Sequence, residues 1–193
     1  MDRAAVAVIL ASELEIPEIL LIRRADRPNG PWSGHMAFPG GRTSPIDVDD
    51  RATAERETQE EIGVNLADHA VYLGPLNDVQ GRRGGELLSL KISPHVYHIA
   101  KWPDWRSDPH EVADIHPIPI THFLKPNHHI LFDHMTRGVT HRLPGIRWGP
   151  HVIWGLTYLI LANFFNLIRD LEVVRAWQNT LDPSQEPFAH WLG

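Results

Sequence analysis

Three glutamates lie close together between residues 56 and 64. On a helix, residues three and four positions apart share a face, so Glu57, Glu60 and Glu61 are expected to project their carboxylates into one patch, and Gly63 is expected to end the helix. Carboxylates this close repel one another. A hard divalent cation relieves that repulsion, and oxygen-only ligands favour Mg²⁺ or Mn²⁺, which commonly bridge carboxylates to substrate phosphates. Taken alone, an acidic helix face is also typical of a solvated surface.

A pair of glycines, Gly40 and Gly41, and a pair of adjacent aspartates, Asp49 and Asp50, precede these glutamates. Gly40 and Gly41 allow the backbone to approach a charged ligand closely or to adopt positive φ, and a carbonyl freed there can be a further oxygen ligand, although a simple turn is the alternative. Asp49 or Asp50 can cap a helix that runs to about Ile62. We therefore expect the glycine pair to lie in the segment just before the acidic helix.

Apolar, β-prone runs separated by turn-forming segments surround this helix. The loop at 26–31 is rich in Pro, Asn and Gly and cannot be the interior of a helix. Strands are expected at 4–10, 18–23, 70–73, 87–99 and 112–118, and C-terminal helices at 152–168 and 171–181.

The composition favours one domain over residues 1–193, because 193 residues with 42% hydrophobic content can bury a sizeable core. The absence of cysteine excludes disulfides and thiolate ligands and is compatible with a reducing cytosol, so we expect a cytoplasmic protein. The apolar N-terminal run is interpreted as a first strand and not a signal peptide. The net charge of -6 gives no basic footprint for nucleic acid.

The segment at 152–168 is the one stretch apolar enough to raise the question of a membrane span. It is short for that purpose, and Thr157, Asn163 and Asn166 interrupt it, so a buried helix and no membrane association are expected. The histidines fit no compact metal-ligand motif and are interpreted as structural or surface residues, notably His128, His129, His134 and His141.

Together, the glycine pair and the acidic helix resemble the Nudix hydrolase box, G-x5-E-x7-R-E-U-x-E-E-x-G-U, where U is aliphatic. The matching positions here are Gly41, Arg56, Glu57, Glu60, Glu61, Gly63 and Val64. Asp47 stands where the box has its first glutamate, eight residues instead of seven separate it from Arg56, and Thr58 occupies an aliphatic position.

The one-residue expansion resembles the coenzyme A pyrophosphatase branch of the Nudix family. An upstream signature of that branch is matched by Leu20, Leu21, Arg24, Gly34 and the block Phe38, Pro39, Gly40 and Gly41. Three positions depart from the signature, namely Ile22, Trp32 and His35. These departures leave the exact substrate open.

The resemblance implies an α+β fold, an α/β/α sandwich around a mixed central β-sheet, in which water attacks a phosphorus atom of a nucleoside diphosphate linked to another group. By the same resemblance, Glu57 and Glu61 are the main metal ligands, Glu60 shares the metal or its water, and the carbonyl of Gly41 adds a ligand. Arg56 is expected to be a fixed counter-charge that orients the carboxylates.

The general base is expected either in the box helix, at Glu60 or Glu61, or in a later loop, where Glu111 is the candidate; a solvated loop acid is the alternative interpretation of Glu111. Arg24, Arg82 and Arg83 are the candidates for binding substrate phosphates, because arginine matches phosphate oxygens bidentately. A solvent-facing loop is the alternative for Arg82 and Arg83.

The predicted activity is therefore a Mg²⁺- or Mn²⁺-dependent pyrophosphatase that cleaves coenzyme A or an acyl-coenzyme A to 3′,5′-ADP and 4′-phosphopantetheine. ADP-ribose, dinucleotides and nucleotide sugars are alternative substrates for the same chemistry. A Nudix-fold module that binds nucleotides without cleaving them is the second alternative, although it would have no need of three crowded carboxylates. The expected partner is a small nucleotide, and a homodimer is the assembly considered.

Overall fold

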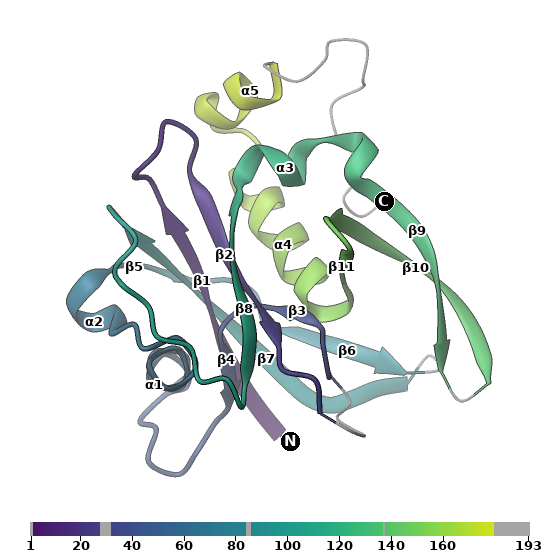
Figure 1. Ribbon diagram of the computed structural model, residues 1–193, viewed down its shortest axis with the longest axis horizontal. Helices are drawn as coiled ribbons and strands as arrows, with labels where there is room; N and C mark the ends of the chain where they lie inside the picture. Colours follow the sequence, from purple (N-terminus) through teal and green to yellow (C-terminus); the bar gives the residue numbers. More distant parts are fainter. Residues whose placement is uncertain (1, 28–31, 84–85, 137, 180–193) are drawn as a thin grey trace. The chain divides into compact units, whose positions relative to one another are not determined.

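The structure, a computed structural model, describes residues 2–27, 32–83, 86–136 and 138–179 (Figure 1). Its internal contacts divide the chain into two compact units, Met1–Ile118 and Pro119–Gly193. The first unit carries the acidic helix and a large sheet, and the second carries a small sheet and the C-terminal helices. The prediction of one domain over the whole chain stays a prediction.

Among the described residues, the first unit is built on an eight-stranded sheet. Five strands follow the order β3-β2-β1-β7-β5, while β4 pairs with β1, β6 with β7 and β8 with β2. Strand β1 runs parallel to β7 and antiparallel to β2 and β4, so the sheet is mixed, as predicted. The strands are β1 (Asp2–Ala11), β2 (Glu18–Arg24), β3 (Met36–Ala37), β4 (Gly40–Arg42), β5 (Val71–Pro75), β6 (Val79–Arg83), β7 (Glu86–Ile99) and β8 (Val112–Pro119).

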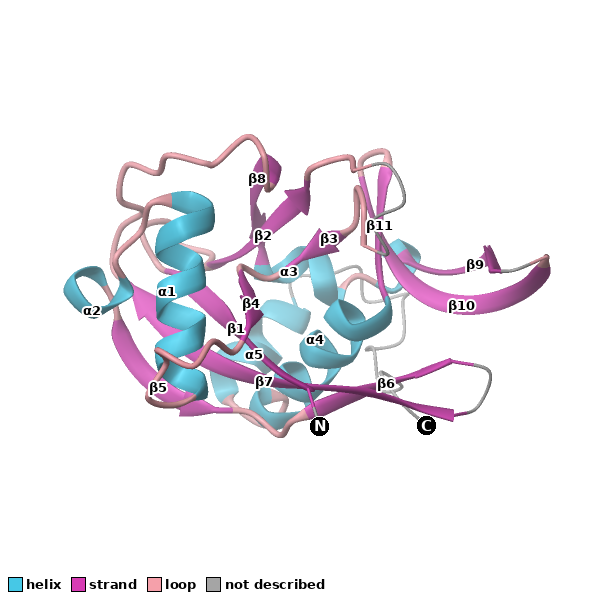
Figure 2. Cartoon of the chain, turned by 90° about the horizontal axis from the view of Figure 1, so that it is seen from below, coloured by secondary structure: helices cyan, strands magenta, loops and turns pink. Residues whose placement is uncertain are grey.

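Strand β1 is central because its side chains are apolar on both faces. Residues 4–9 are all buried, which is the pattern of a strand covered on both sides. Two parallel neighbours in one sheet need a long crossover between them. Here the connection from β1 to β7 includes helix α1 (Asp50–Ile62), which packs on β1 and β4 (Figure 2).

Helix α1 begins and ends where the sequence predicts. The Asp49 side chain accepts a 2.7 Å hydrogen bond from the backbone N–H of Ala52 at the first turn. At the other end Gly63 adopts a left-handed φ of 73° and donates its N–H to the carbonyl of Gln59. A short helix, α2 (Leu66–His69), follows.

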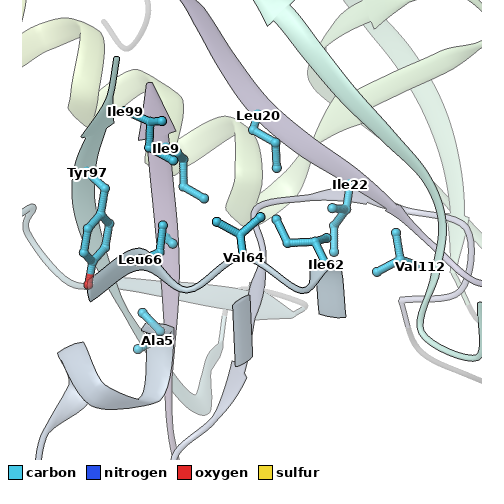
Figure 3. Close-up of a cluster of buried hydrophobic side chains, with 12 residues drawn as sticks. Ala5, Ile9, Leu20, Ile22, Ile62, Val64, Leu66, Tyr97, Ile99 and Val112 are labelled. Atoms are coloured by element: carbon cyan, nitrogen blue, oxygen red, sulfur yellow. The ribbon is translucent and has the colours of Figure 1, made fainter. Parts of the chain in front are cut away.

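A hydrophobic cluster fixes the C-terminal end of α1 against the sheet (Figure 3). Ile62, Val64 and Leu66 are almost completely buried against strand residues. Burying one isoleucine side chain fully stabilises a fold by about 1.5–3 kcal/mol, so this contact holds the helix firmly. Their partners include Ile9, Leu20, Ile22, Tyr97, Ile99 and Val112.

The second unit contains a three-stranded antiparallel sheet in the order β11-β10-β9. Helix α4 contacts β10 and β11 and buries residues such as Ile160, Leu161 and Phe165. The elements are α3 (Ile120–Leu124), a 3₁₀ turn (Pro126–His128), β9 (His129–Thr136), β10 (Val139–Trp148), β11 (His151–Trp154), α4 (Gly155–Ile168) and α5 (Glu172–Asn179).

The start of the predicted helix at 152–168 differs in the structure. Residues His151–Trp154 form strand β11, in which Val152 and Ile153 pair with β10, and α4 begins at Gly155 with a φ of 63°. β-Branched side chains favour a strand, and a glycine in the left-handed region allows the chain to turn from strand to helix. Helix α5 lies within the predicted 171–181, whose last residues are outside the described part. None of the described helices has the length and apolar content that a bilayer crossing needs.

Three of the histidines predicted to be structural or surface residues make contacts within the second unit. His128 contacts the carbonyl of His122 at 3.0 Å through Nδ1, and His129 contacts that of Phe123 at 2.8 Å through Nε2. The ring of His134 lies 4.4 Å from that of Trp154. Bonds to backbone carbonyls and a contact between rings are typical of structural histidines.

Candidate metal and active site

Three carboxylates from two separate segments converge in the first unit. Glu57, Glu61 and Glu111 each offer an oxygen, and these oxygens all lie within 4.8 Å of one another. Glu57 and Glu61 stand one turn apart on α1, whereas Glu111 comes from the loop that leads into β8. The Glu61 side chain is 1% exposed and that of Glu111 is 39% exposed, so the cluster extends from the interior to the surface.

The loop that carries Glu111 is attached to the end of α1. The last carbonyls of a helix lack partners within it and must bond elsewhere. Here the carbonyls of Glu61 and Ile62 accept hydrogen bonds from the N–H groups of Asp108 and Arg106, at 3.0 and 2.9 Å. The backbone therefore brings the loop to the same helical turn that presents Glu61.

The predicted glycine pair, Gly40 and Gly41, lies next to the two helix glutamates of the cluster. The N–H of Gly40 donates a 2.8 Å hydrogen bond to Oε2 of Glu61. A Cβ at Gly41 would overlap the carboxylate of Glu57, and a Cβ at Gly40, whose φ is 145°, would overlap the carbonyl of Ala5. Only glycine permits this approach of strand β4 to the acidic helix.

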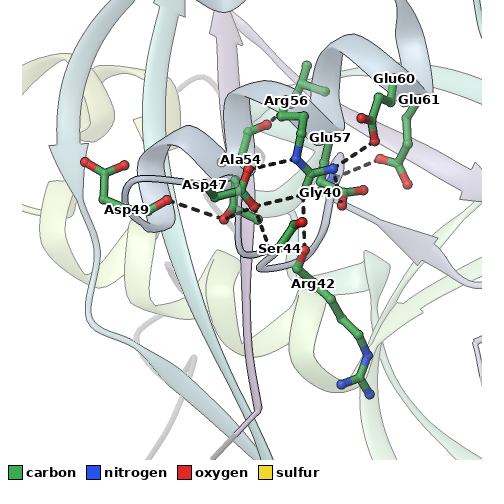
Figure 4. Close-up of polar contacts among 12 residues, drawn as sticks. Gly40, Arg42, Ser44, Asp47, Asp49, Ala54, Arg56, Glu57, Glu60 and Glu61 are labelled. Atoms are coloured by element: carbon green, nitrogen blue, oxygen red, sulfur yellow. Dashed lines mark hydrogen bonds and ion pairs between the residues drawn. The ribbon is translucent and has the colours of Figure 1, made fainter.

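Arg56 binds the carboxylates around it, as Figure 4 shows. Its guanidinium contacts Asp47 at 2.8 Å, Glu57 at 2.9 Å and Glu60 at 2.9 Å. The same guanidinium donates a 3.2 Å hydrogen bond to the carbonyl of Arg42. This geometry suits the predicted counter-charge, because one planar group sets the direction of the Glu57 carboxylate.

Asp47, which replaces the first glutamate of the box, ties the preceding loop to α1. Its side chain is 3% exposed and accepts hydrogen bonds from Arg56, from Thr53 Oγ1 and from the N–H of Ser44. The Arg56 guanidinium holds the pKa of Asp47 well below its usual range, with smaller contributions from Ser44 and Thr53. A charged Asp47 is therefore part of the folded loop.

Glu60 lies outside the three-carboxylate cluster. Its side chain is 57% exposed, and its carboxylate rests on Arg56. On a helix the next residue turns by about 100°, so Glu60 and Glu61 point in different directions. The expected role of Glu60 at the metal or in catalysis stays a prediction.

Burial opposes the negative charge of the two helix glutamates. Burial raises the pKa of Glu61 to about 7, while the N–H of Gly40 and Arg24 act against the rise and the Glu57 and Glu111 charges add to it. Burial likewise raises the pKa of Glu57. Three oxygen donors that repel one another, with Glu61 buried among them, fit a hard divalent cation, which would stabilise their charged forms.

The basic residues predicted to bind substrate fall into two groups. Arg24 lies at the cluster, with Nη1 3.3 Å from Oε1 of Glu61. The backbones of Arg82 and Arg83 belong to strand β6, but their side chains lie outside the described part of the structure. Gly41, whose carbonyl is the other predicted ligand, belongs to β4, and its Cα side faces the carboxylate of Glu57.

Sequence reasoning missed Arg27. Its Nη2 lies 3.4 Å from Oε1 of Glu111, and the same guanidinium bonds the carbonyl of His110. The available signal was a third nearby arginine, after Arg23 and Arg24, within the segment that precedes the glycine pair.

With this geometry established, comparison with known proteins gives the family. A sequence model of the NUDIX domain matches residues 1–137, most of the chain, so the chain belongs to the Nudix family. The α+β class with its mixed central sheet is the fold that this resemblance implied, and it is confirmed. The match includes all three clustered carboxylates.

Among curated relatives, the human mitochondrial coenzyme A diphosphatase NUDT8 is 34% identical over 169 residues, which are 86% of this chain and 69% of that protein. An uncharacterized protein of Schizosaccharomyces pombe is 35% identical over 142 residues, 64% of this chain. The match spans only 43% of the length of the yeast protein. The expected similarity to coenzyme A pyrophosphatases within the family is thus confirmed.

Among solved structures, a MutT/nudix family protein from Enterococcus faecalis superposes with a TM-score of 0.56, at 17% sequence identity. The match covers 88% of this chain and 62% of that one. At this identity the likeness shows the fold alone.

Proposed function

We propose that this protein is a Mg²⁺-dependent pyrophosphohydrolase that cleaves coenzyme A or an acyl-coenzyme A. Water adds to one phosphorus of the diphosphate and the bridging P–O bond breaks; coenzyme A gives 3′,5′-ADP and 4′-phosphopantetheine, and an acyl-coenzyme A gives 3′,5′-ADP and the acylated 4′-phosphopantetheine. The observation that carries this proposal is the convergence of Glu57, Glu61 and Glu111 within 4.8 Å beside Gly41.

Glu57, Glu61 and Glu111 are the residues that would hold Mg²⁺ or Mn²⁺, with the carbonyl of Gly41 as a further ligand. A bound divalent ion supplies Lewis acidity, offsets the diphosphate charge and acidifies an attacking water. Arg56 keeps Glu57 directed toward the cluster, and the N–H of Gly40 does the same for Glu61.

Glu111 is also our candidate for the general base. It is the most exposed carboxylate of the three, so it can accept a proton from water and release it to solvent. Arg24 is our candidate for donating hydrogen bonds to a phosphate oxygen, and its contact with Glu61 supports this role. Together these residues provide a proton acceptor and a phosphate-binding cation.

The choice of coenzyme A within the Nudix range is supported by similarity to the human and mouse NUDT8 proteins, both named coenzyme A diphosphatases. Arg82 and Arg83, near the end of strand β6, are our candidates for the 3′-phosphate of coenzyme A. We further propose that the protein is cytoplasmic, that it binds neither nucleic acid nor membranes, and that it forms a homodimer. Light scattering of the purified protein would test the dimer.

The experiment that tests this function is a substrate panel with product identification by mass. The protein would be incubated with Mg²⁺ or Mn²⁺ and coenzyme A, acetyl-coenzyme A, ADP-ribose, a diadenosine polyphosphate and a nucleotide sugar. We expect the coenzyme A substrates to give the highest kcat/KM, with 3′,5′-ADP and 4′-phosphopantetheine as products from coenzyme A and 3′,5′-ADP and acetyl-4′-phosphopantetheine from acetyl-coenzyme A.

A higher kcat/KM for another member of the panel would identify that compound as the preferred substrate, and the proposed diphosphate hydrolysis would still stand. Tight nucleotide binding with no hydrolysis of any member would instead favour a binding module and contradict the proposed activity.

A further inference from the structure

Arg27 contacts the loop that carries Glu111 more closely than it contacts Glu111 itself. Its Nη2 and Nε donate hydrogen bonds to the carbonyl of His110 at 2.8 and 3.2 Å, and its Nη2 lies 3.4 Å from Oε1 of Glu111. Nearby, the N–H of Ala25 donates a 2.8 Å hydrogen bond to the carbonyl of Glu111. The segment after strand β2 therefore bonds both peptide carbonyls that flank the Glu111 N–H and Cα.

Each of the three clustered carboxylates has an arginine partner, but the three arginines contact different parts of the structure. Arg56 and Arg24 contact Glu57 and Glu61, which the helix already fixes in place. Glu111 lies outside the helix: among the described residues, its loop bonds the end of α1 through the N–H groups of Arg106 and Asp108, and the N–H of Glu111 itself donates to the carbonyl of Asp108. The other end of the loop is bonded by Arg27, to the carbonyl of His110, and by the N–H of Ala25, to the carbonyl of Glu111.

We propose that Arg27 is a positioning residue that holds Glu111 at the metal site. This inference rests on the proposed function, because it assigns Glu111 to the carboxylate set that binds the divalent ion. Two donors of one planar guanidinium share the His110 carbonyl, which fixes the direction of the loop, and the ion pair then orients the carboxylate. Partners of metal ligands commonly set the affinity of a metal site in this way.

Lysine would keep the charge of Arg27 but lose the planar pair of donors. Arg23, four residues earlier and within β2, is a matched control: its ion pairs are with Asp26 and with Asp114 of the neighbouring strand β8, not with the clustered carboxylates. Comparing variants of the two arginines therefore distinguishes the loss of a contact with the Glu111 loop from a general effect of removing a positive charge near β8.

The test is calorimetric titration of the full, substrate-free protein with Mn²⁺. We expect Arg27→Ala to raise the Kd for Mn²⁺ by about 10-fold or more, Arg27→Lys to raise it less, and Arg23→Ala to leave it within about 2-fold of the wild-type value. Thermal melting of each variant checks that the fold is retained. An unchanged Kd in folded Arg27→Ala would overturn the proposal.

A double-mutant cycle asks whether Arg27 acts through Glu111. In a Glu111→Gln background, Arg27→Ala should add little further loss of Mn²⁺ affinity, because the group that it positions is already impaired as a ligand. A full additional loss in that background would also overturn the proposal, since Arg27 would then act independently of Glu111.

The same titrations separate this inference from the proposed function. If wild-type protein binds Mn²⁺ and Glu61→Gln weakens that binding, the carboxylate site stands whatever Arg27→Ala does. If Glu61→Gln leaves the Kd unchanged, the metal site itself is wrong, and the role of Arg27 falls with it.

Discussion

At the scale of single residues, Glu61 is almost completely buried beside two other carboxylates. Its neighbours offer only partial compensation, through the N–H of Gly40 and the guanidinium of Arg24. A structural role would be met as well by an uncharged side chain of the same shape. The charged form of Glu61 is therefore unfavourable at neutral pH unless a cation is bound beside it.

The first prediction follows from that cost. A pKa raised from 4.5 to about 7 means that folded Glu61 binds a proton that the unfolded chain releases within this range. Stability of the metal-free protein should therefore fall as pH rises through this window. Glu61→Gln should raise the Tm relative to wild type by more at about pH 8 than at about pH 5, measured by thermal melting with a chelator.

The exposed neighbour Glu60 provides the control for this measurement. Glu60→Gln removes an acid from an exposed position of the same helix, so it controls for a general effect of losing a negative charge from α1. An equal effect of Glu61→Gln at both values would mean that Glu61 is not held in the unfavourable environment described above.

The second prediction concerns Gly41. A methyl group there would overlap the carboxylate of Glu57 and force it away from Glu61 and Glu111. Gly41→Ala should therefore weaken Mn²⁺ binding by about 10-fold or more, and the protein should still unfold cooperatively. Titration with Mn²⁺ and thermal melting of one sample check both points; retained affinity would show that Glu57 needs no such space.

At the scale of elements, the site depends on helix α1 and on the loop bonded to its end. The helix limits could be predicted, because an N-cap aspartate and a left-handed glycine are local signals. The position of Glu111 could not, since it follows from backbone hydrogen bonds between segments far apart in sequence. Strands β4 and β6 were missed because short, glycine-containing strands lack a clear alternation of polar and apolar residues.

The third prediction tests the N-cap of α1. Asp49→Ala should lower the free energy of unfolding by about 1 kcal/mol, because the N–H of Ala52 loses its side-chain acceptor. Urea denaturation measures this change. Gln59→Ala, an exposed site within the same helix, should alter it by less than about 0.5 kcal/mol, and equal losses in both variants would remove the cap as the cause.

At the scale of the whole molecule, the mixed sheet and its central apolar strand followed from the sequence pattern and the family resemblance together. The hairpin of β9 and β10 did not, because its residues are largely polar or exposed and give no periodic signal. The same division holds for function. In the proposed function, the chemistry depends on carboxylates in one helix and one loop, whereas substrate choice depends on residues outside the box, such as Arg82 and Arg83.

The fourth prediction addresses that choice. If Arg82 or Arg83 binds the 3′-phosphate of coenzyme A, then Arg82→Ala and Arg83→Ala should reduce the preference for coenzyme A over dephospho-coenzyme A. The loss should be about 10-fold in the ratio of kcat/KM values for at least one of the two variants, as expected for a charged hydrogen bond. Unchanged ratios in both would place the 3′-phosphate elsewhere.

The most direct test of the central claim compares hydrolysis of coenzyme A by wild-type protein and by Glu61→Gln over a range of Mg²⁺ concentrations. We expect wild-type turnover to require Mg²⁺ and the variant to lose at least about 100-fold in turnover, because a ligand charge is removed. Full Mg²⁺-dependent activity in Glu61→Gln would contradict the assignment of the Glu57, Glu61 and Glu111 cluster as the metal site.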